Sequence, residues 1–564
     1  SGLAASTRVN FTVSAPTLGM GAKTVTGTAF DPVTVTLPAL TTGDHPVRIT
    51  ARATTAAGAI SDALERTLRV VGSRFTTTID AHLALPAALP PGTGSGITTV
   101  LVADEGRGRF LAEAQELARS GMAGGRLEQL FAASMARDLL SEAFDMTPAE
   151  DASDPGANLS PYMHVTSDED SYVVAWSVLP FSSEALEVSA RAALLEPDLA
   201  GSEGLVEYLR RILVDSTAGA ATRERGILAL AGLAMLTTAE ESGVRQLAQH
   251  ALSGGDPLET IRSLLDEVGA AELTPRELLV LAVAAARLGD GATARAIVGP
   301  LVAASGERLG PWVRLAVPGG EDAVVEATWL LAIVAAEVGD PISEAARAYV
   351  EENPGVMIRP LEQAAWLRAS VASAPSGPST YAWTIDGMRR TDTLGAGEVR
   401  RFELTPAQRA GFSVEQLAGA VGVTLEWAEP VSPASLTVDP ALSITRKVEP
   451  AAPIAANAAV RVTIRTRVGT GLQLTGCHLV TDLVPSGLQP TTWDGRFDRE
   501  SDELSPWSIS GQRVTFCAST EPLVYYARVV TPGRYRWEPA LLQLAGALDH
   551  VAMTEAITLR ISAP

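Results

Sequence analysis

The sequence predicts a multidomain protein of helices and strands, in which a block of packed helices is inserted among β modules. Its length of 564 residues exceeds that of one compact domain, since domains commonly hold roughly 100–200 residues. Hydrophobic residues alternate with polar ones up to residue 75 and again beyond residue 380, which is the period of strands. Between residues 105 and 373 they recur at i, i+3, i+4 and i+7, the period of amphipathic helices.

A first β module is expected over residues 1–75, where short alternating runs are bounded by Gly, Pro, Asp or Ser. Pro and Gly then cluster between Leu85 and Gly96. Because the hydrophobic period changes from two to about 3.6 after this cluster, we place a helical domain at 76–375.

Helix starts are recognisable inside this helical domain. Residues 256–259 (DPLE) and 274–277 (TPRE) each combine an N-cap oxygen, a proline at the first helical position and a glutamate that reaches back to the cap amide. Short loops between such helices favour antiparallel neighbours, so we expect a helical ring or stack.

Strand patterns return after the Pro/Gly/Ser stretch 374–379 and continue to a second break near residue 432. The segments 1–75 and 376–432 are each too short to bury a good core alone. We therefore predict that they form one β domain, into which the helical domain is inserted.

The last part of the chain, 433–564, shows the clearest alternation. Val460, Val462 and Ile464 are each followed by a polar residue, so one strand face is expected to be buried and the other wet. Further apolar runs separated by Pro-Ser-Gly and Pro-Gly turns predict a terminal β-sandwich of about seven strands.

Charge and composition exclude several classes of function. The chain holds 44 Lys and Arg against 65 acidic residues, a formal charge of −21 that repels a phosphate backbone, so we expect no nucleic acid partner. The longest apolar runs are too short to span a bilayer. Two cysteines exclude a multi-Cys metal site, and the scattered histidines form no HExxH motif, so no metal or cofactor is expected.

One short sequence near the start of the helical domain resembles a known signature. Gly125-Arg126-Leu127-Glu128-Gln129 precedes an apolar helical pattern and is similar to the Gly-Cys-x-Glu-Gln thioester motif of the α2-macroglobulin and complement family. In that family the motif begins an α/α-toroid thioester domain, which is inserted into a CUB-type β domain and followed by macroglobulin-like or receptor-binding β-sandwiches. The stretches 61–66 (SDALER) and 523–538 (LVYYARVVTPGRYRWE) look like bacterial members, so the resemblance covers essentially the whole chain.

Arg126 departs from this family pattern in the residue that carries the chemistry. In active members the Cys thiolate attacks the Gln carboxamide and expels ammonia, leaving an acyl group for transfer to a target. A guanidinium is permanently charged and cannot accept an acyl group, so Gln129 is expected to remain an ordinary amide. Glu128 and Gln129 then either cap and pack the helix or shape a docking surface.

The resemblance implies the C-terminal portion of a thioester-less α2-macroglobulin-like protein, which is not an enzyme. Its implied role is non-covalent trapping of proteases after a bait segment is cut, with the bait upstream in the same precursor, since the chain opens on Ser1-Gly2 without a leader. The alternative is an exported cell-surface or periplasmic scaffold that binds another protein without inhibiting it. A toroid hydrolase would require clustered carboxylates in a pocket at the ring centre.

Three further features are candidates on weaker grounds. An exported protein favours a disulfide between Cys477 and Cys517 over two free thiols. The acidic stretch 150–170 could hold calcium, but its spacing is not that of an EF-hand, which favours a solvated loop. His164 follows the motif helix and is the histidine to inspect for a vestigial acyl-transfer role, against the simpler interpretation of a loop residue.

Overall fold

The computed structural model of the protein divides into two compact units. One unit comprises residues 1–77 with 429–436, and the other comprises 78–428 with 437–564. No helix among the described residues is long and apolar enough to cross a membrane. The structure describes residues 3–31, 33, 35–38, 40, 43–55, 58–70, 75–90, 96–120, 126–146, 159–168, 171–180, 182–215, 220–236, 261–262, 273–353, 359–455, 458–469, 478–492, 497, 503–544 and 547–562.

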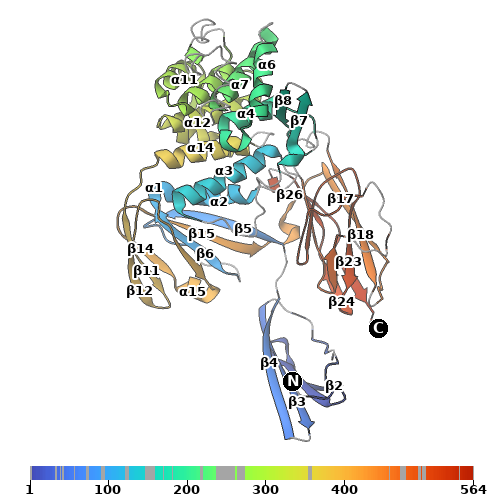
Figure 1. The fold of residues 1–564 in the computed structure, drawn as a ribbon. Helices are drawn as coiled ribbons and strands as arrows, with labels where there is room; N and C mark the ends of the chain where they lie inside the picture. The colour runs from blue at the N-terminus through green and yellow to red at the C-terminus, as the bar shows by residue number, and fades with distance from the viewer. Residues whose placement is uncertain are drawn as a thin grey trace. The chain divides into compact units, whose positions relative to one another are not determined.

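The N-terminal unit is built on one antiparallel sheet of order β2-β1-β3-β4 (Figure 1). Its strands are β1 (Arg8–Ala15), β2 (Met20–Thr28), β3 (Gly43–Thr55) and β4 (Gly58–Val70). Alternating residues such as Val9 and Val13 are buried on one face, as the sequence pattern predicts.

The predicted sharing of one β domain by residues 1–75 and 376–432 is wrong. The strands of the N-terminal unit pair with one another, and none of them joins a strand from 376–430 in the described residues. Strands from 376–430 instead pair with strands from 76–104, which the sequence pattern had placed in the helical domain. We call the domain formed by these two segments the split module. The error arose because the Pro/Gly cluster after Leu85 connects two strands of one sheet and does not separate two domains.

The split module contains a four-stranded sheet of order β13-β6-β15-β5 and a three-stranded sheet of order β12-β11-β14. Buried residues from both sides of the insertion fill its core, among them Val100, Val102, Tyr381 and Val423. The strands are β5 (Thr76–Ala84), β6 (Thr98–Asp104), β11 (Ser379–Ile385), β12 (Met388–Leu394), β13 (Arg400–Leu404), β14 (Ser413–Ala418) and β15 (Val421–Pro430).

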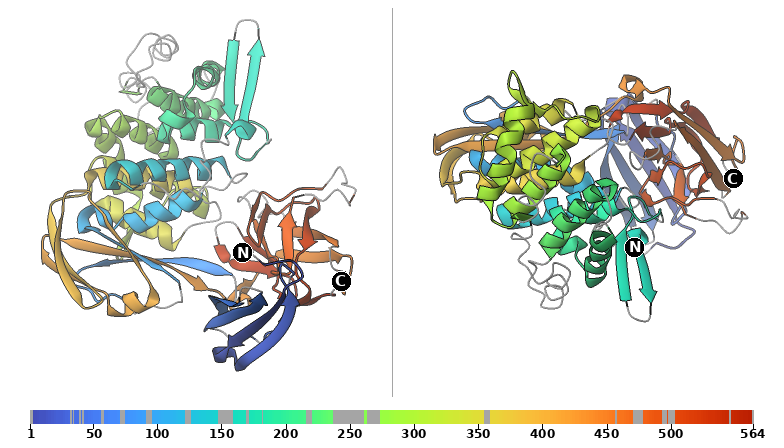
Figure 2. Two further views of the ribbon diagram at one scale, coloured as in Figure 1. Left: turned by 60° about the horizontal axis from the view of Figure 1, so that its bottom comes forward. Right: turned by 90° about the horizontal axis from the view of Figure 1, so that it is seen from above.

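Helices of the inserted block form a ring with an outer layer (Figures 1 and 2). Neighbouring inner helices pack in the order α3, α4, α7, α10, α12, α14 and back to α3, whereas α2, α6, α11 and α13 pack mainly against α3, α7, α10 and α12, respectively. The inner helices are α3 (Leu127–Phe144), α4 (Leu186–Leu195), α7 (Ala220–Leu236), α10 (Pro275–Arg287), α12 (Glu321–Glu337) and α14 (Pro360–Ser373). The outer helices are α2 (Leu111–Ser120), α6 (Glu203–Asp215), α11 (Gly291–Ser305) and α13 (Ile342–Glu352). Every residue of α12 from Ala327 to Ala336 is buried, as expected for a helix enclosed by others.

One of the two predicted helix starts can be checked. The Thr274 hydroxyl accepts a hydrogen bond from the Glu277 N–H at 3.2 Å, and Glu277 Oε2 accepts from the Thr274 N–H at 2.7 Å. This reciprocal pair begins α10 with Pro275 at its first position. The other predicted start, residues 256–259, lies outside the described residues.

Residues from Thr437 onward form a terminal β-sandwich, as predicted, but the described residues include twelve strands where about seven were expected. One sheet has the order β16-β26-β25-β19-β22-β21, the other β17-β18-β23-β20, and β24 pairs with β27 beside them. Val460, Val462 and Ile464 of β18 are all buried, which confirms the predicted inward face. The strands are β16 (Thr437–Val438), β17 (Leu442–Glu449), β18 (Ala459–Val468), β19 (Leu479–Leu483), β20 (Leu488–Thr491), β21 (Ser508–Ser510), β22 (Arg513–Cys517), β23 (Leu523–Val529), β24 (Gly533–Trp537), β25 (Leu541–Leu544), β26 (Ala547–Met553) and β27 (Ile557–Ile561).

Candidate functional site

The motif noted in the sequence lies at the start of the inner helix α3. Arg126 is the N-cap, and its backbone N–H donates to Oε1 of Gln129 at 3.0 Å. The Arg126 guanidinium also donates to Oε1 of Glu128 at 2.7 Å, and both side chains are buried. Gln129 therefore acts as a helix cap through its amide oxygen, which is the first of the two roles considered for it. Gly125 lies outside the described residues.

No thioester can form at this motif because the chain offers no sulfur there. The sequence holds two cysteines, and neither lies in the helical block. Cys517 ends β22 of the terminal sandwich and is disulfide-bonded. The other cysteine, Cys477, lies outside the described residues.

The start of α3 is joined by its backbone to the segment that leads into α4. The Leu127 N–H donates to the Val178 carbonyl at 2.9 Å, and the Ala185 N–H donates to the Trp176 carbonyl at 2.8 Å. Two neighbouring inner helices therefore begin at the same end of the ring, with Arg126 and Glu128 beside this junction.

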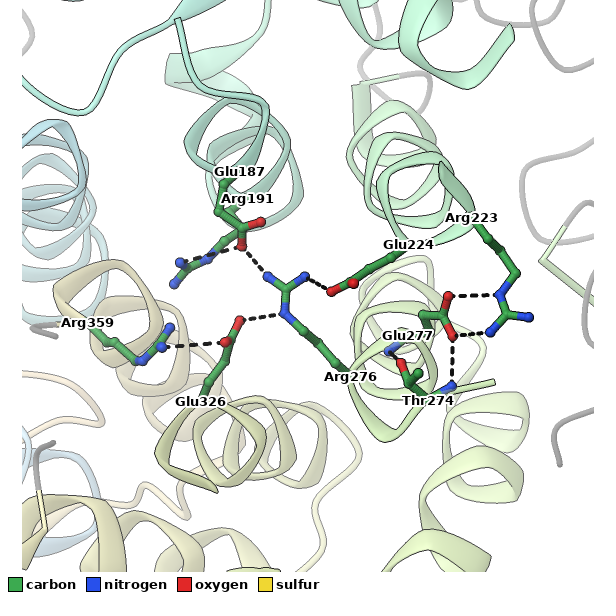
Figure 3. Close-up of polar contacts among 9 residues, drawn as sticks. All are labelled: Glu187, Arg191, Arg223, Glu224, Thr274, Arg276, Glu277, Glu326 and Arg359. Carbon is green, nitrogen blue, oxygen red and sulfur yellow. Dashed lines mark hydrogen bonds and ion pairs between the residues drawn. The ribbon is translucent and has the colours of Figure 1, made fainter. Parts of the chain in front are cut away.

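Acidic and basic residues also meet near the N-terminal ends of the inner helices α4, α7, α10, α12 and α14 (Figure 3). Arg276 of α10 contacts carboxylates from three other helices, namely Glu187 of α4, Glu224 of α7 at 2.6 Å and Glu326 of α12 at 3.0 Å. Burial alone would lower the pKa of Arg276, but the charges of Glu187 and Glu326 raise it above its usual value. Arg276 therefore joins four inner helices through charge-assisted contacts.

Glu326 also connects this group to α14. Its Oε2 atom lies 3.4 Å from the guanidinium of Arg359, the residue directly before that helix. Burial alone would raise the pKa of Glu326, but the charges of Arg359 and Arg276 outweigh burial and bring the pKa below its usual value. The carboxylate therefore stays ionised. Burial, followed by repulsion from Arg191, lowers the pKa of Arg359 to about 10.

Two other pairs extend the network. The Arg223 guanidinium of α7 donates to both carboxylate oxygens of Glu277 of α10, at 2.9 and 3.0 Å (Figure 3). Glu277 also accepts a hydrogen bond from the Thr274 N–H at the start of α10. Arg191 of α4 forms an ion pair with the buried Glu362 of α14. These contacts complete a group of acidic and basic residues from five inner helices, which we call the ring-end network: Glu187, Arg191, Arg223, Glu224, Arg276, Glu277, Glu326, Arg359 and Glu362.

The chemistry of the ring-end network is structural. A general acid for glycoside hydrolysis needs a carboxyl whose pKa is raised, whereas Arg223 and Thr274 outweigh burial and lower the pKa of Glu277, as Arg359 and Arg276 do for Glu326. No cluster of three or more metal-ligating side chains occurs among the described residues. The geometry at this end of the ring gives no support to the toroid hydrolase.

The remaining candidates from the sequence are dispersed. His164 lies on the hairpin strand β7 (Met163–Asp168), which pairs with β8 (Ser171–Trp176) and projects from the helical block (Figure 2). Within the described residues, no hydrogen bond joins His164 to Arg126, Glu128 or Gln129. Most of the acidic stretch 150–170 lies outside the described residues, so the calcium question stays a prediction.

The terminal sandwich borders a hollow of about 470 Å³ that no sequence pattern predicts. Leu179 and Pro180, which follow the carbonyl bound by Leu127, form one wall. The rest of the lining comes from the sandwich and includes the apolar residues Val468, Leu504, Trp507, Phe516 and Leu523. These residues are far apart in the sequence, so no local pattern predicts that they share one surface.

The architecture is similar to that of solved protein structures. No family model and no curated protein matches the sequence. Native α2-macroglobulin from Escherichia coli, spanning domain MG7 to the C-terminus, matches 100% of this chain and 95% of that chain at 14% identity and a TM-score of 0.52. The native conformation of the E. coli protein by cryo-electron microscopy matches at 15% identity and a TM-score of 0.52, and a mutant of Salmonella α2-macroglobulin at 14% and 0.50.

The chain therefore has the fold of bacterial α2-macroglobulin from domain MG7 to the C-terminus, as the resemblance in the sequence implies. It covers 38% of the longer E. coli chain and 39% of the Salmonella chain.

Proposed function

We propose that this chain is the C-terminal portion of a bacterial α2-macroglobulin-like protein that restrains proteases without forming a covalent bond to them. The fold, matched over the whole chain, supports the family assignment. By this assignment the N-terminal unit corresponds to MG7, the split module to the CUB-type domain, the helical ring to the thioester domain and the terminal sandwich to a macroglobulin domain. The chain itself is not an enzyme.

Arg126 is the observation on which the non-covalent mechanism depends. By the resemblance of residues 125–129 to the thioester motif, it stands where the thioester Cys would be, and its buried guanidinium donates to the buried carboxylate of Glu128. Acyl transfer to a protease needs an activated acyl group, which an unmodified Gln129 amide is not. Steric enclosure after cleavage of an upstream bait remains as the mechanism.

An exported location fits the same proposal. Cys517 is disulfide-bonded, and disulfides persist in oxidising compartments such as the periplasm and the cell surface. We propose that Cys477, the other cysteine of the chain, is its partner.

Limited proteolysis of the full-length precursor tests the proposal. A broad-specificity protease should make one early cut outside the domains described here, followed by a decrease in the radius of gyration in small-angle scattering. Treatment with a catalytically inactive form of the protease is the matched control and should change neither quantity. Cleavage without compaction would instead support the scaffold, which holds partners but encloses nothing.

A further inference from the structure

The strand β4 of the N-terminal unit has one open edge in the part of the chain that the structure describes. It pairs with β3 along its whole length, from Thr55 opposite Gly58 to Gly43 opposite Val70. It is also the last strand of the order β2-β1-β3-β4 (Figure 1). Residues 58–67 are all exposed. The outward N–H and C=O groups of such a strand are a ready template for pairing with another chain.

Apolar surface continues to this open edge. Ile60 lies opposite the buried Ala53, and Leu64 lies opposite Ile49, so both leave the sheet on its apolar face. Ile60 is nevertheless 46% exposed and Leu64 is 49% exposed. The core of the unit leaves these two side chains half uncovered.

Two opposite charges alternate with the apolar residues on this face. Asp62 lies opposite Ala51 and Arg66 lies opposite Val47, so neither meets an opposite charge on β3. Both side chains are exposed, and the structure shows no ion pair for either of them within the described residues. The face therefore presents Ile60, Asp62, Leu64, Arg66 and Leu68 in sequence along one edge.

We propose that β4 pairs antiparallel with β4 of a second copy of this chain, about a two-fold axis at Leu64. Each Leu64 then lies opposite the Leu64 of the copy, and Ile60 lies opposite Leu68 of the copy. Asp62 lies opposite Arg66 of the copy, and the symmetry repeats that charge pair on the other side of the axis. The two sheets join into one sheet with a continuous apolar face.

Charge selects this register over its neighbours. A two-fold axis normal to the sheet keeps each residue on its own face, so the register can move only in steps of two. A step of two in either direction places Asp62 opposite a leucine. A step of four places either Asp62 or Arg66 opposite its own copy, where like charges repel. The register centred on Leu64 is the one in which both charges are matched.

Sedimentation velocity of the full chain at increasing concentration tests the pairing. The wild type should show a reversible monomer–dimer equilibrium, weak because a single strand pair buries little area. Asp62→Arg and Arg66→Asp should each remain monomeric, whereas an equimolar mixture of the two variants should dimerise again. Glu65→Gln changes a charge on the opposite face of β4 and is the matched control, which should dimerise like the wild type.

Cross-linking provides a second readout. Leu64→Cys should form a covalent dimer under mild oxidation, because each introduced thiol faces its own copy. Ser61→Cys should not, because its opposite residue in the copy is Thr67. A wild type that stays monomeric at all concentrations would show that Asp62 and Arg66 only protect the edge from pairing. A dimer that survives Asp62→Arg, or a mixture that stays monomeric, would equally overturn the proposal.

Discussion

The hydroxyl of Tyr525 donates a hydrogen bond of 2.8 Å to Oδ2 of Asp482 in the centre of the terminal sandwich. The other carboxylate oxygen accepts from Nε1 of Trp537 at 3.0 Å and from Arg446 at 2.7 Å. All four side chains are buried or nearly so. Tyr525 and Trp537 both belong to the stretch 523–538 noted in the sequence, and in this chain they bind the same buried carboxylate.

Replacing Tyr525 should destabilise the terminal sandwich. Tyr525→Phe leaves one oxygen of a buried carboxylate without its donor, which costs about 2 kcal/mol. The neighbouring Tyr526 is the matched control, because its buried hydroxyl has no hydrogen-bond partner among the described residues. Hydrogen exchange in peptides of β18 and β23 should accelerate in Tyr525→Phe and change little in Tyr526→Phe. Equal effects of the two substitutions would contradict the assigned role of Asp482.

Breaking the pair at the degenerate motif should destabilise the helical ring. Glu128→Leu leaves the buried guanidinium of Arg126 without its carboxylate, at a cost of about 3 kcal/mol. The double variant Arg126→Met with Glu128→Leu removes both charges and should recover most of this loss. Urea unfolding followed by circular dichroism at a helix wavelength measures both changes. If the double variant were as unstable as the single one, packing and not charge would explain the effect.

Asp80 should give the protein a measurable pH dependence. Burial raises the pKa of this carboxyl from 3.8 to about 6, although Arg119 counteracts part of the effect. Because the folded-state pKa is the higher one, the folded state binds a proton first as the pH falls. Asp80 therefore adds stability on acidification from about pH 6 to about pH 4 and loses it again as the pH rises. The urea midpoint of the wild type relative to that of Asp80→Asn should therefore increase as the pH falls over this range, and a constant difference between the two proteins would contradict the raised pKa.

The native protein should be indifferent to methylamine. Thioester members lose one ammonia when the bond forms and gain methylamine when it opens, and neither step is possible with Arg126 at the Cys position. Peptide mass spectrometry should show an unmodified Gln129 before and after treatment. Arg126→Cys is an informative comparison, since it places a thiol three residues before Gln129. A deficit of one ammonia in the wild-type peptide would contradict the account.

The sequence predicted those features that depend on neighbouring residues, namely strand faces and helix caps. The alternation at Val460 to Ile464 and the cap formed by Thr274 and Glu277 both depend on residues a few positions apart. The division of the β modules depends on which distant strands pair, such as Phe402 opposite Val100, and hydrophobic period carries no such information.

The ring-end network could not be predicted from the sequence either, because it depends on contacts between residues far apart in the chain. Glu187, Arg276 and Glu326 each look like ordinary charged residues near a helix start. They become one group only when the ring closes and brings several first turns together. Arg126 was different, because its neighbours in the sequence already define the motif from which it departs.

Recovery of a protease with the full-length precursor tests the non-covalent mechanism most directly. The precursor is incubated with an active protease, separated from free protease by size, and divided between a native and a denaturing gel. The account predicts that the protease co-elutes, still cleaves a small substrate, and is released completely on denaturation. A covalent protease adduct on the denaturing gel, or a protease that never co-elutes, would contradict it.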